Sequence, residues 1–574
     1  MFSNKVKSLI EVKKKTSSVS KSTNGFVNGA LKNAAITTSG NGSLKYNTSG
    51  NDFLDQFAAI STYREIRSFE KVSKDMGLLY SLNKEKAIAL TLYIRMVTRE
   101  IAYFDGTKSE EVQKGQGLKH EAIMRMLWLA INDKKSFWNN IHLFISAGSW
   151  KDIITMMSYD LQYHGWKDKK LDWEQFADLI MAGLENENTS NLVKKYLPQI
   201  KAKSKCTTVE SQADTIIAKY ICSKIFGNKS DIKSSYKSYR KLKTSGNAHE
   251  WQQLISKKLF NEINFNSVHG RALSLLVSGK FIKNNDLEDK YLKWIEKQPV
   301  AKYTGFVYEL VAPVKKGYTN QILTKYQEHT INKQFMGLVE LGKKKTACET
   351  RFIAALDTSS SMTSKVNGID VSAYDVAKSV ALYFSYMLEG QFKDYFFEFN
   401  DGACLTTWKG STPVERLRND RSEAYGSTNF LAIGNEFAKL KKIGISEDEF
   451  PTGIIAISDG EFNRGSSSNK TNVAQFKKIL EKANFSKEFV DNFTFVIWDI
   501  PNGYYGGRDQ QRFETFGDHS NVFYMAGFDP LALAFLFGST EKKDKEGKVI
   551  VPKSADELME VALSQEIMSK IKIS

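Results

Sequence analysis

The chain has 574 residues, enough for two or more domains, and its hydrophobic content of 41% is sufficient for substantial cores. No apolar stretch approaches the roughly 18–20 residues of a membrane span, and the segment after Met1 lacks the apolar core of a signal peptide, so we expect a cytoplasmic protein. The net charge of +16 is uneven, because residues 1–350 contain 55 Lys and Arg against 34 Asp and Glu, whereas residues 351–574 contain 26 against 31. This asymmetry favours a polyanionic partner for the first part, with a merely solvated basic surface as the alternative.

Residues 1–50 are predicted to form a flexible basic arm. They are rich in Ser, Thr, Asn, Gly and Lys and contain one acidic residue, Glu11. Such a segment buries too little apolar surface to offset the entropy that it loses on ordering. We expect the arm to pack along the next domain at points such as Phe26 and Tyr46.

Residues 51–347 are predicted to form a helical module. Proline is nearly absent there, and Pro198, Pro299 and Pro313 fall where helices are expected to end. Helices of medium length with short polar turns indicate an α-helical solenoid, although no repeat of constant length is found. The clearest helical patterns cover residues 87–103, 119–131, 138–146, 150–163, 213–226 and 251–263.

The densest basic tract lies within this module, where residues 201–250 contain 11 Lys and Arg against four Asp and Glu. Tyr236 and Tyr239 are interleaved with these cations, and an aromatic side chain stacks an unpaired base at about 1–3 kcal/mol. Neutralising several phosphates gives binding that tolerates sequence changes and weakens with salt. No recognition-helix or zinc-finger pattern is present, which favours RNA over duplex DNA. For any single Lys, a solvated helix face is the simpler explanation, so the prediction concerns the tract as a whole.

A glycine-containing turn, Lys114-Gly-Gln-Gly-Leu-Lys-His-Glu121, precedes one of the predicted helices. Backbone amides at a helix N-terminus can bind a phosphate, but the spacing is not that of a nucleotide-hydrolysing P-loop, and a structural turn is the alternative. The seven histidines form no zinc or triad pattern, so we do not expect an enzyme. The candidate RNA-binding residues are Lys114, Lys119, His120, Lys194, Lys195, Lys201, Lys203, Lys205, Lys233, Lys237, Tyr239, Arg240, Lys241, Lys243, Lys257 and Lys258.

The most informative motif is Asp357-Thr-Ser-Ser-Ser361, which reads D-x-S-x-S directly after the apolar run 352–356. A short apolar run bounded by a turn signal indicates a buried parallel strand. One carboxylate and two hydroxyls then lie at its carboxyl end, where open α/β sheets bind ligands. Oxygen donors of this kind suit Mg²⁺ or Mn²⁺. A metal-free, serine-rich turn is the alternative.

The sequence after this motif alternates between predicted helices and strands. A helix is expected over 370–387, and a further helix begins near Thr428. Asp459 follows one of the strands. The pattern predicts a doubly wound α/β sheet, with strands at 352–356, 395–399, 453–457, 493–498 and 521–525 and with later helices from Asp529 and over 554–570.

This layout resembles the von Willebrand factor A domain, whose metal-ion-dependent adhesion site uses D-x-S-x-S together with a Thr and an Asp. The resemblance implies a metal site that is made by Asp357, Ser359, Ser361, Thr428 and Asp459. The metal would complete its coordination with a carboxylate from a protein partner.

A helical module followed by an A domain is similar to the Ro ribonucleoprotein family, a TROVE ring plus an A domain, and above all to its bacterial and phage-like branch. The segments that resemble it are 49–57, Arg99 with 114–121, Ser149-Trp150-Lys-Asp152, 239–242 and 262–268. Lys119 and Ser149 depart from the arginines expected there, and Arg and Lys are not interchangeable in RNA recognition. The resemblance implies a HEAT-like ring that binds small structured RNA outside and single-stranded RNA ends in its hole, in RNA quality control and without catalysis.

We therefore expect a basic arm at 1–50, a TROVE-like module at 51–347 and an A domain at 348–574, in a monomeric RNA-binding scaffold. One alternative is an adaptor without RNA, whose A domain works with an AAA+ ATPase. A metal-dependent nuclease that uses Asp357 and Asp459 is disfavoured, because two carboxylates are too few for the usual two-metal arrangement.

Overall fold

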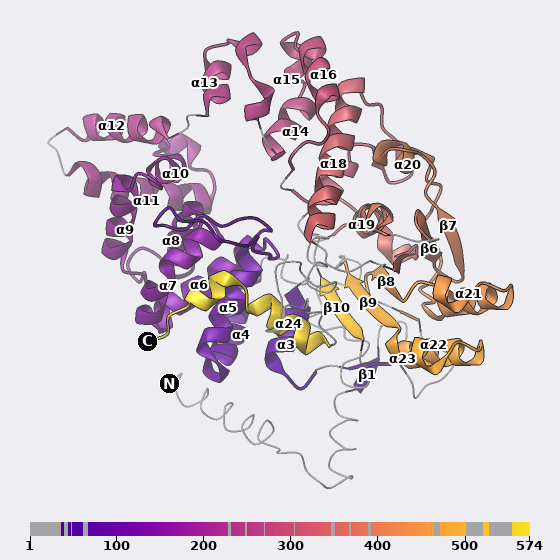
Figure 1. Ribbon diagram of the computed structural model, residues 1–574. Helices are drawn as coiled ribbons and strands as arrows, with labels where there is room; N and C mark the ends of the chain where they lie inside the picture. Colours follow the sequence, from indigo (N-terminus) through magenta and orange to yellow (C-terminus); the bar gives the residue numbers. More distant parts are fainter. Residues whose placement is uncertain are drawn as a thin grey trace, which may run out of the picture.

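The computed structural model describes residues 36–38, 44–46, 49–60, 67–227, 231–246, 249–268, 270–303, 305–345, 351–366, 369–388, 392–460, 462–463, 471–500, 521–526 and 554–574. A helical part comes first and an α/β part with a six-stranded sheet follows, in the order that the sequence predicts. The helices follow an arc that leads from α3 to α18 and then into the sheet (Figure 1). None of the helices in the described ranges combines the length and apolarity of a membrane span.

Two short hairpins accompany the helices of the first part. Strands β1 (Ile36–Thr38) and β2 (Leu44–Tyr46) are antiparallel, as are β3 (Lys315–Lys316) and β4 (Thr319–Asn320). Phe26, in the predicted arm, lies outside the described residues. The helices are α3 (Asp52–Ala58), α4 (Phe69–Leu82), α5 (Lys84–Arg95), α6 (Lys119–Asn132), α7 (Lys134–Ala147), α8 (Trp150–His164), α9 (Trp173–Glu185), α10 (Ser190–Tyr196), α11 (Val209–Phe226), α12 (Ile232–Ser245), α13 (Glu250–Ser256), α14 (Gly270–Ser278), α15 (Phe281–Asn284), α16 (Glu288–Lys297), α17 (Val307–Val311) and α18 (Lys325–Lys345).

In the first part of the chain, two predicted helices are shorter than their apolar patterns. Helix α5 ends at Arg95, and the chain continues as extended segments in which Arg99 pairs with Gln113. Ile101 is nevertheless fully buried. Its apolar character therefore indicated a buried position, but not a helical one. Helix α13 ends at Ser256, close to Lys258, whose φ of +59° is incompatible with a continuing helix.

The sheet has the order β10-β9-β8-β5-β6-β7, and all of its pairs are parallel except β6 with β7. The predicted strands are confirmed, while the antiparallel edge strand β7 was not predicted. The strands are β5 (Phe352–Asp357), β6 (Tyr395–Phe399), β7 (Ala403–Thr407), β8 (Gly453–Ser458), β9 (Thr494–Asp499) and β10 (Val522–Ala526), and the helices are α19 (Ala373–Met387), α20 (Pro413–Asn419), α21 (Leu431–Lys442), α22 (Asn472–Lys482), α23 (Lys487–Asn492) and α24 (Ala555–Leu563).

The chain builds this sheet outward from its middle. Strand β5 is first in the sequence, β6 and β7 are added on one side, and β8, β9 and β10 are added on the other. The strand order therefore reverses between β5 and β8, which is the doubly wound topology that the sequence predicts. Every residue of β8 is buried, as expected for a strand that is covered on both faces. The helix predicted from Asp529 lies outside the described residues.

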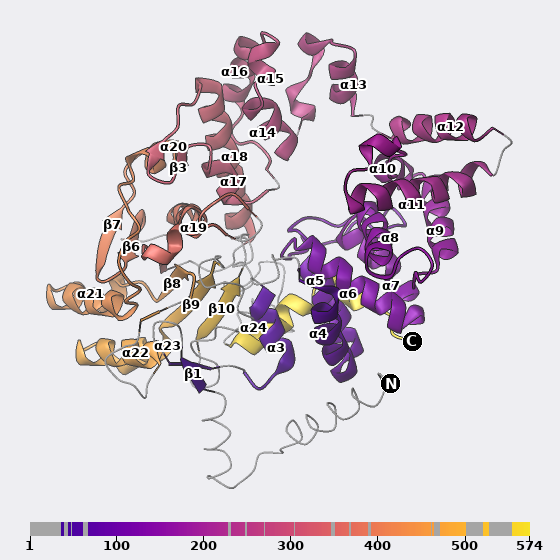
Figure 2. The same cartoon turned by 180° about the vertical axis from the view of Figure 1, so that it is seen from behind.

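The C-terminal segment, residues 554–574, returns from the sheet to the helical part. Helix α24 packs against β10, α3 and α5 (Figures 1 and 2). Beyond it, the Gln565 side chain accepts a hydrogen bond from the Lys114 amide at 2.6 Å and donates one to the Lys114 carbonyl at 2.8 Å. Further on, Asn140 bonds both the amide and the carbonyl of Lys572. The domain boundary between residues 347 and 348 remains a prediction. Residues 554–574 belong to the second predicted domain but pack against the first.

Candidate metal centre and nucleic-acid interface

The candidate metal centre lies at the carboxyl ends of β5 and β8, the two strands between which the strand order reverses. Asp357 is the final residue of β5, and Asp459 directly follows β8. This is the edge at which open α/β sheets bind ligands. In the segment after β5, Ser359 is the N-cap residue of a short 3-10 helix, Ser360–Thr363, that contains Ser361, and Thr428 precedes α21. All five side chains are buried, Asp357 and Asp459 completely and Ser361 least, at 7% exposure.

Hydrogen bonds organise the loop after β5. The amide of Ser359 donates to Asp357 Oδ1 at 2.8 Å, and the hydroxyl oxygens of Ser359 and Ser361 lie 3.1 Å apart. Ser458, at the end of β8, donates its hydroxyl to Asp357 Oδ2. The Gly460 amide donates to the same hydroxyl oxygen at 3.1 Å, so the two loops with the carboxylates are joined.

The electrostatics of this edge favour a cation. Burial, followed by the nearby charge of Asp459, raises the pKa of Asp357 to about 7, although hydrogen bonds from Ser458 and Ser359 oppose the shift. A divalent cation beside the two carboxylates would offset both causes. Two carboxylates and three hydroxyls are hard oxygen donors, so the residues present fit Mg²⁺ or Mn²⁺. In the described part of the chain no three His, Cys, Asp or Glu side chains form a metal-binding group, so the hydroxyls are essential to this assignment.

Thr428 is positioned by residues that the sequence did not reveal as part of the site. The Thr428 amide donates to Asn463 Oδ1 at 3.3 Å, and the Asn463 amide donates to the Thr428 carbonyl at 2.8 Å. Asn463 also donates to the hydroxyl of Ser427, whose amide donates to Asp401 at 2.9 Å. The hydrogen bonds from Ser427 lower the pKa of Asp401. The turn Asn400-Asp401-Gly402 was a signal for a loop at this edge, but not for a contact with Thr428.

The basic tract forms an exposed stripe on α12. Lys233, Lys237 and Lys241 follow one another at intervals of four residues, with Arg240 beside them, and all four are exposed. Helix α12 contains no acidic residue. Its buried residues are Ser235 and Tyr239, and it packs against α10 and α11. The exposed face therefore presents four cations. We call Lys233, Lys237, Arg240 and Lys241 the α12 stripe.

Three residues of the predicted interface have structural roles instead. Tyr239 is fully buried and donates its hydroxyl to the Pro198 carbonyl at 3.1 Å, so it is not available to stack a base. Lys114 is 3% exposed and is covered by Gln565, so its turn is not an open phosphate cradle. The Lys243 ammonium donates to the carbonyls of Lys195 and Leu197, at the end of α10. Such a cation favourably complements a helix C-terminus.

A second group of charges surrounds Asp214 on α11. Burial raises the pKa of Asp214, the nearby ammonium groups of Lys201, Lys151 and Lys119 oppose the shift, and the charge of Glu210 adds to it. Lys151, at the start of α8, was not among the predicted residues. The His120 ring contacts the hydroxyl of Tyr159 while the rest of the side chain reaches solvent. Partial desolvation of the ring, followed by the charge of Lys119, lowers the pKa of His120. The fold thus brings together side chains from four separate parts of the sequence.

The other predicted residues are scattered around these groups. Lys194 and Lys195 are half-buried on α10, and Lys205 is exposed. Lys257 and Lys258 are exposed after α13, whose apolar side chains pack in a second hydrophobic cluster. The side chain of Lys203 lies outside the described residues.

Comparison with known proteins does not assign this chain to a family. No family model matches the chain, and no curated protein matches it. Among solved structures, it is similar to the crystal structure of the Ro (RSR) protein of Deinococcus radiodurans, with a TM-score of 0.29 and 13% identity, covering 72% of this chain and 86% of that one. A match at this level does not assign a family.

Proposed function

We propose that this protein is an RNA-binding scaffold of the Ro type, rather than an enzyme. Its helical part would hold small structured RNA and single-stranded RNA ends, and its α/β part would bind Mg²⁺ or Mn²⁺ and recruit a protein partner. The observation that carries the proposal is the α12 stripe, where four exposed cations share one helix that contains no acidic residue.

The geometry of the stripe suits a phosphate backbone. A step of four residues advances about 6 Å along an α-helix, so the cations form a regular row. Contacts between such a row and phosphates release counterions and carry no sequence information. The group around Asp214 lies close to this helix, since burial lowers the pKa of Lys243 on α12 and the charge of Asp214 opposes that shift. Single-stranded RNA could follow the row without a base-reading helix.

The metal centre supports the second half of the proposal. Asp357 and Asp459 would hold the cation together with the hydroxyls of Ser359, Ser361 and Thr428. A bound divalent cation supplies positive charge and an open coordination position, which the Asp or Glu of a partner can fill. The two carboxylates alone are a poor basis for hydrolysis, because they do not supply the ligands of a two-metal nuclease.

The second candidate is a protein adaptor without RNA, whose A domain pairs with an AAA+ ATPase. The buried carboxylate pair of Asp357 and Asp459 favours this reading equally well, because a metal-dependent protein contact does not require the basic helices. The α12 stripe separates the two candidates, since only the RNA-binding scaffold gives it a role.

Binding to defined RNAs tests the proposal. The purified full chain is titrated with a structured RNA that has a single-stranded 3′ tail, with the same RNA without its tail, and with duplex DNA. We expect tight binding that weakens steeply with salt, is strongest for the tailed RNA, and leaves the RNA intact in the presence of Mg²⁺. If no RNA binds at low salt, the adaptor function replaces the proposal, and if the RNA is cleaved, the protein is an enzyme.

A further inference from the structure

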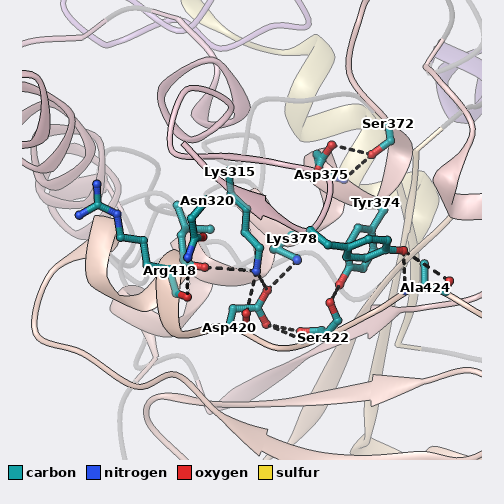
Figure 3. A network of polar contacts seen from close by, with 12 residues as sticks. Lys315, Asn320, Ser372, Tyr374, Asp375, Lys378, Arg418, Asp420, Ser422 and Ala424 are labelled. Carbon is teal, nitrogen blue, oxygen red and sulfur yellow. Dashed lines mark hydrogen bonds and ion pairs between the residues drawn. The ribbon is translucent and has the colours of Figure 1, made fainter. Parts of the chain in front are cut away.

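The loop that contains Thr428 is held by the helical part of the protein. This loop, residues 420–428, connects α20 to α21 and is called the Thr428 loop below. The hairpin of β3 and β4, which lies between α17 and α18, contacts this loop through Lys315 and Tyr318 (Lys315 is shown in Figure 3). Because the hairpin precedes the D-x-S-x-S motif by about forty residues in the sequence, this contact joins the two parts of the chain.

The start of the Thr428 loop is fixed by a buried cluster of charges. The Lys315 ammonium of the hairpin donates to the Asp420 carbonyl at 2.7 Å and lies 3.4 Å from Asp420 Oδ2. Lys378 of α19 forms an ion pair with the same oxygen at 2.6 Å. All three residues are less than 9% exposed. Removing one partner of a buried ion pair leaves an uncompensated charge, so this arrangement strongly favours one position of the loop.

The middle of the Thr428 loop is fixed by two tyrosine hydroxyls. Tyr318, in the turn of the hairpin, accepts a hydrogen bond from the Ala424 amide at 3.0 Å and lies 3.4 Å from the Ala424 carbonyl, to which it donates. Tyr374 of α19 donates to the Ser422 carbonyl at 2.5 Å (Figure 3). Main-chain groups of the loop are therefore bonded to side chains from both the hairpin and α19.

The end of the Thr428 loop is bonded to the loop after β5. The Tyr425 amide donates to the Thr358 carbonyl at 2.7 Å, and the Ser360 amide donates to the Gly426 carbonyl at 3.1 Å. Thr358 and Ser360 alternate with the metal-binding residues of the D-x-S-x-S motif. Between the hairpin and the candidate metal centre there is thus a series of hydrogen bonds that is joined by short stretches of backbone.

From this series we propose that the β3–β4 hairpin positions the metal centre, with Lys315 and Tyr318 as positioning residues that touch no metal. The inference rests on the proposed metal site and goes beyond it, because it makes the affinity for the cation depend on the helical part. Thermodynamic linkage makes the dependence reciprocal, so that metal binding also stabilises the hairpin in its contact with the Thr428 loop. Events on the helical part that move the hairpin would release the cation.

Manganese binding to the full-length chain tests this proposal. Free Mn²⁺ is measured by its electron paramagnetic resonance signal during titration of the unsubstituted chain and of three variants. Tyr318→Phe deletes only the hydroxyl, and Lys315→Met deletes the ammonium. Tyr395→Phe is the matched control, because Tyr395 is an exposed tyrosine on β6 of the same sheet. Thermal unfolding without metal establishes that each variant is folded.

We expect Tyr318→Phe and Lys315→Met to weaken Mn²⁺ binding about 10- to 100-fold, the usual effect of residues that orient metal ligands, while Tyr395→Phe has no effect. If Lys315→Met does not fold, Tyr318→Phe alone decides, because Tyr318 is 49% exposed and its loss is mild. A second measurement follows amide hydrogen exchange in residues 315–320. Mg²⁺ should slow this exchange in the unsubstituted chain and leave it unchanged in the Asp357→Asn variant.

The outcomes distinguish the two proposals. If the unsubstituted chain binds Mn²⁺ while Tyr318→Phe binds it as tightly as Tyr395→Phe does, and Mg²⁺ leaves exchange in the hairpin unchanged, the hairpin has no positioning role and the metal site stands. If the unsubstituted chain binds no Mn²⁺, the metal site is refuted and the positioning role with it.

Discussion

Neutralising the α12 stripe is the most direct perturbation of the proposed RNA interface. The variant replaces Lys233, Lys237, Arg240 and Lys241 with Gln. All four side chains are exposed, and the residues that pack α12 onto the protein, Ser235 and Tyr239, are unchanged. Exposed substitutions of this kind usually change stability by less than about 0.5 kcal/mol each, so the variant should remain folded.

The size of the effect follows from the number of phosphate contacts. On a single strand each neutralised phosphate contributes about 0.7 to the slope of log K against log salt, so the loss of four contacts should reduce the slope by about 2.8. Between about 50 and 200 mM salt, the affinity ratio of the unsubstituted chain to the variant should therefore shrink about 50-fold. The defect is largest at low salt and becomes small at high salt.

Fluorescence anisotropy of a labelled single-stranded RNA, titrated at several salt concentrations, measures both slopes. The matched control replaces Lys442, Lys478, Lys482 and Lys487 with Gln, four exposed lysines of the α/β part. Both variants lose the same net charge, so a general electrostatic attraction would weaken them equally. Equal slopes for the variant and the control would refute the reasoning that α12 contacts the RNA backbone.

Three further predictions concern the metal centre and the C-terminal segment. Mn²⁺ at about 100 times its Kd should stabilise the unsubstituted chain by about 2.7 kcal/mol in thermal unfolding and should leave Asp357→Asn unchanged. The folded-state pKa of Asp357 is raised to about 7, so in the metal-free protein this group favours folding at low pH and loses that contribution as the pH rises toward 7. Protons compete with Mn²⁺ for the carboxylate, so the stabilisation by Mn²⁺ should shrink as the pH falls below about 7. A stabilisation that stays constant across that range would contradict the site. Replacing Gln565 with Leu removes two hydrogen bonds to the buried main chain of Lys114, which should cost about 2–4 kcal/mol in urea denaturation. Ser569→Ala, at an exposed position, should cost less than about 0.5 kcal/mol.

The set of candidate metal ligands comes from the resemblance to the A-domain motif, and local sequence patterns predicted where its two carboxylates lie. Asp357 comes directly after one short apolar run, Asp459 follows a second run after one intervening residue, and the carboxyl ends of parallel strands meet at one edge of a sheet. The groups that hold Thr428 have no such pattern. The contacts of Asn463 and Lys315 arise from the packing of segments that are distant in the sequence. Neither a turn residue nor a lysine in a short hairpin indicates, from the sequence alone, which residue it will contact.

The basic surface could be predicted only in part, for similar reasons. The stripe on α12 follows from helical spacing, and the same spacing places Ser235 and Tyr239 on the opposite, buried face, so the burial of Tyr239 was present in the pattern. The burial of Lys114 was not, because the residue that covers it, Gln565, lies 451 residues later. Charge composition located the surface, but it did not separate exposed ammonium groups from those that bond main-chain carbonyls.

The return of residues 554–574 to the helical part has a consequence during protein synthesis. Asn140 finds its partner Lys572 only after 432 further residues have been made. At a translation rate of about 5–20 residues per second, synthesis of those residues takes about 20–90 s. During that time the surface of the helical part that residues 554–574 will cover, here called the seam, stays exposed. Folding of the first part is therefore completed only after the sheet has been translated, and a chain that stops early keeps an open seam to which chaperones and proteases have access.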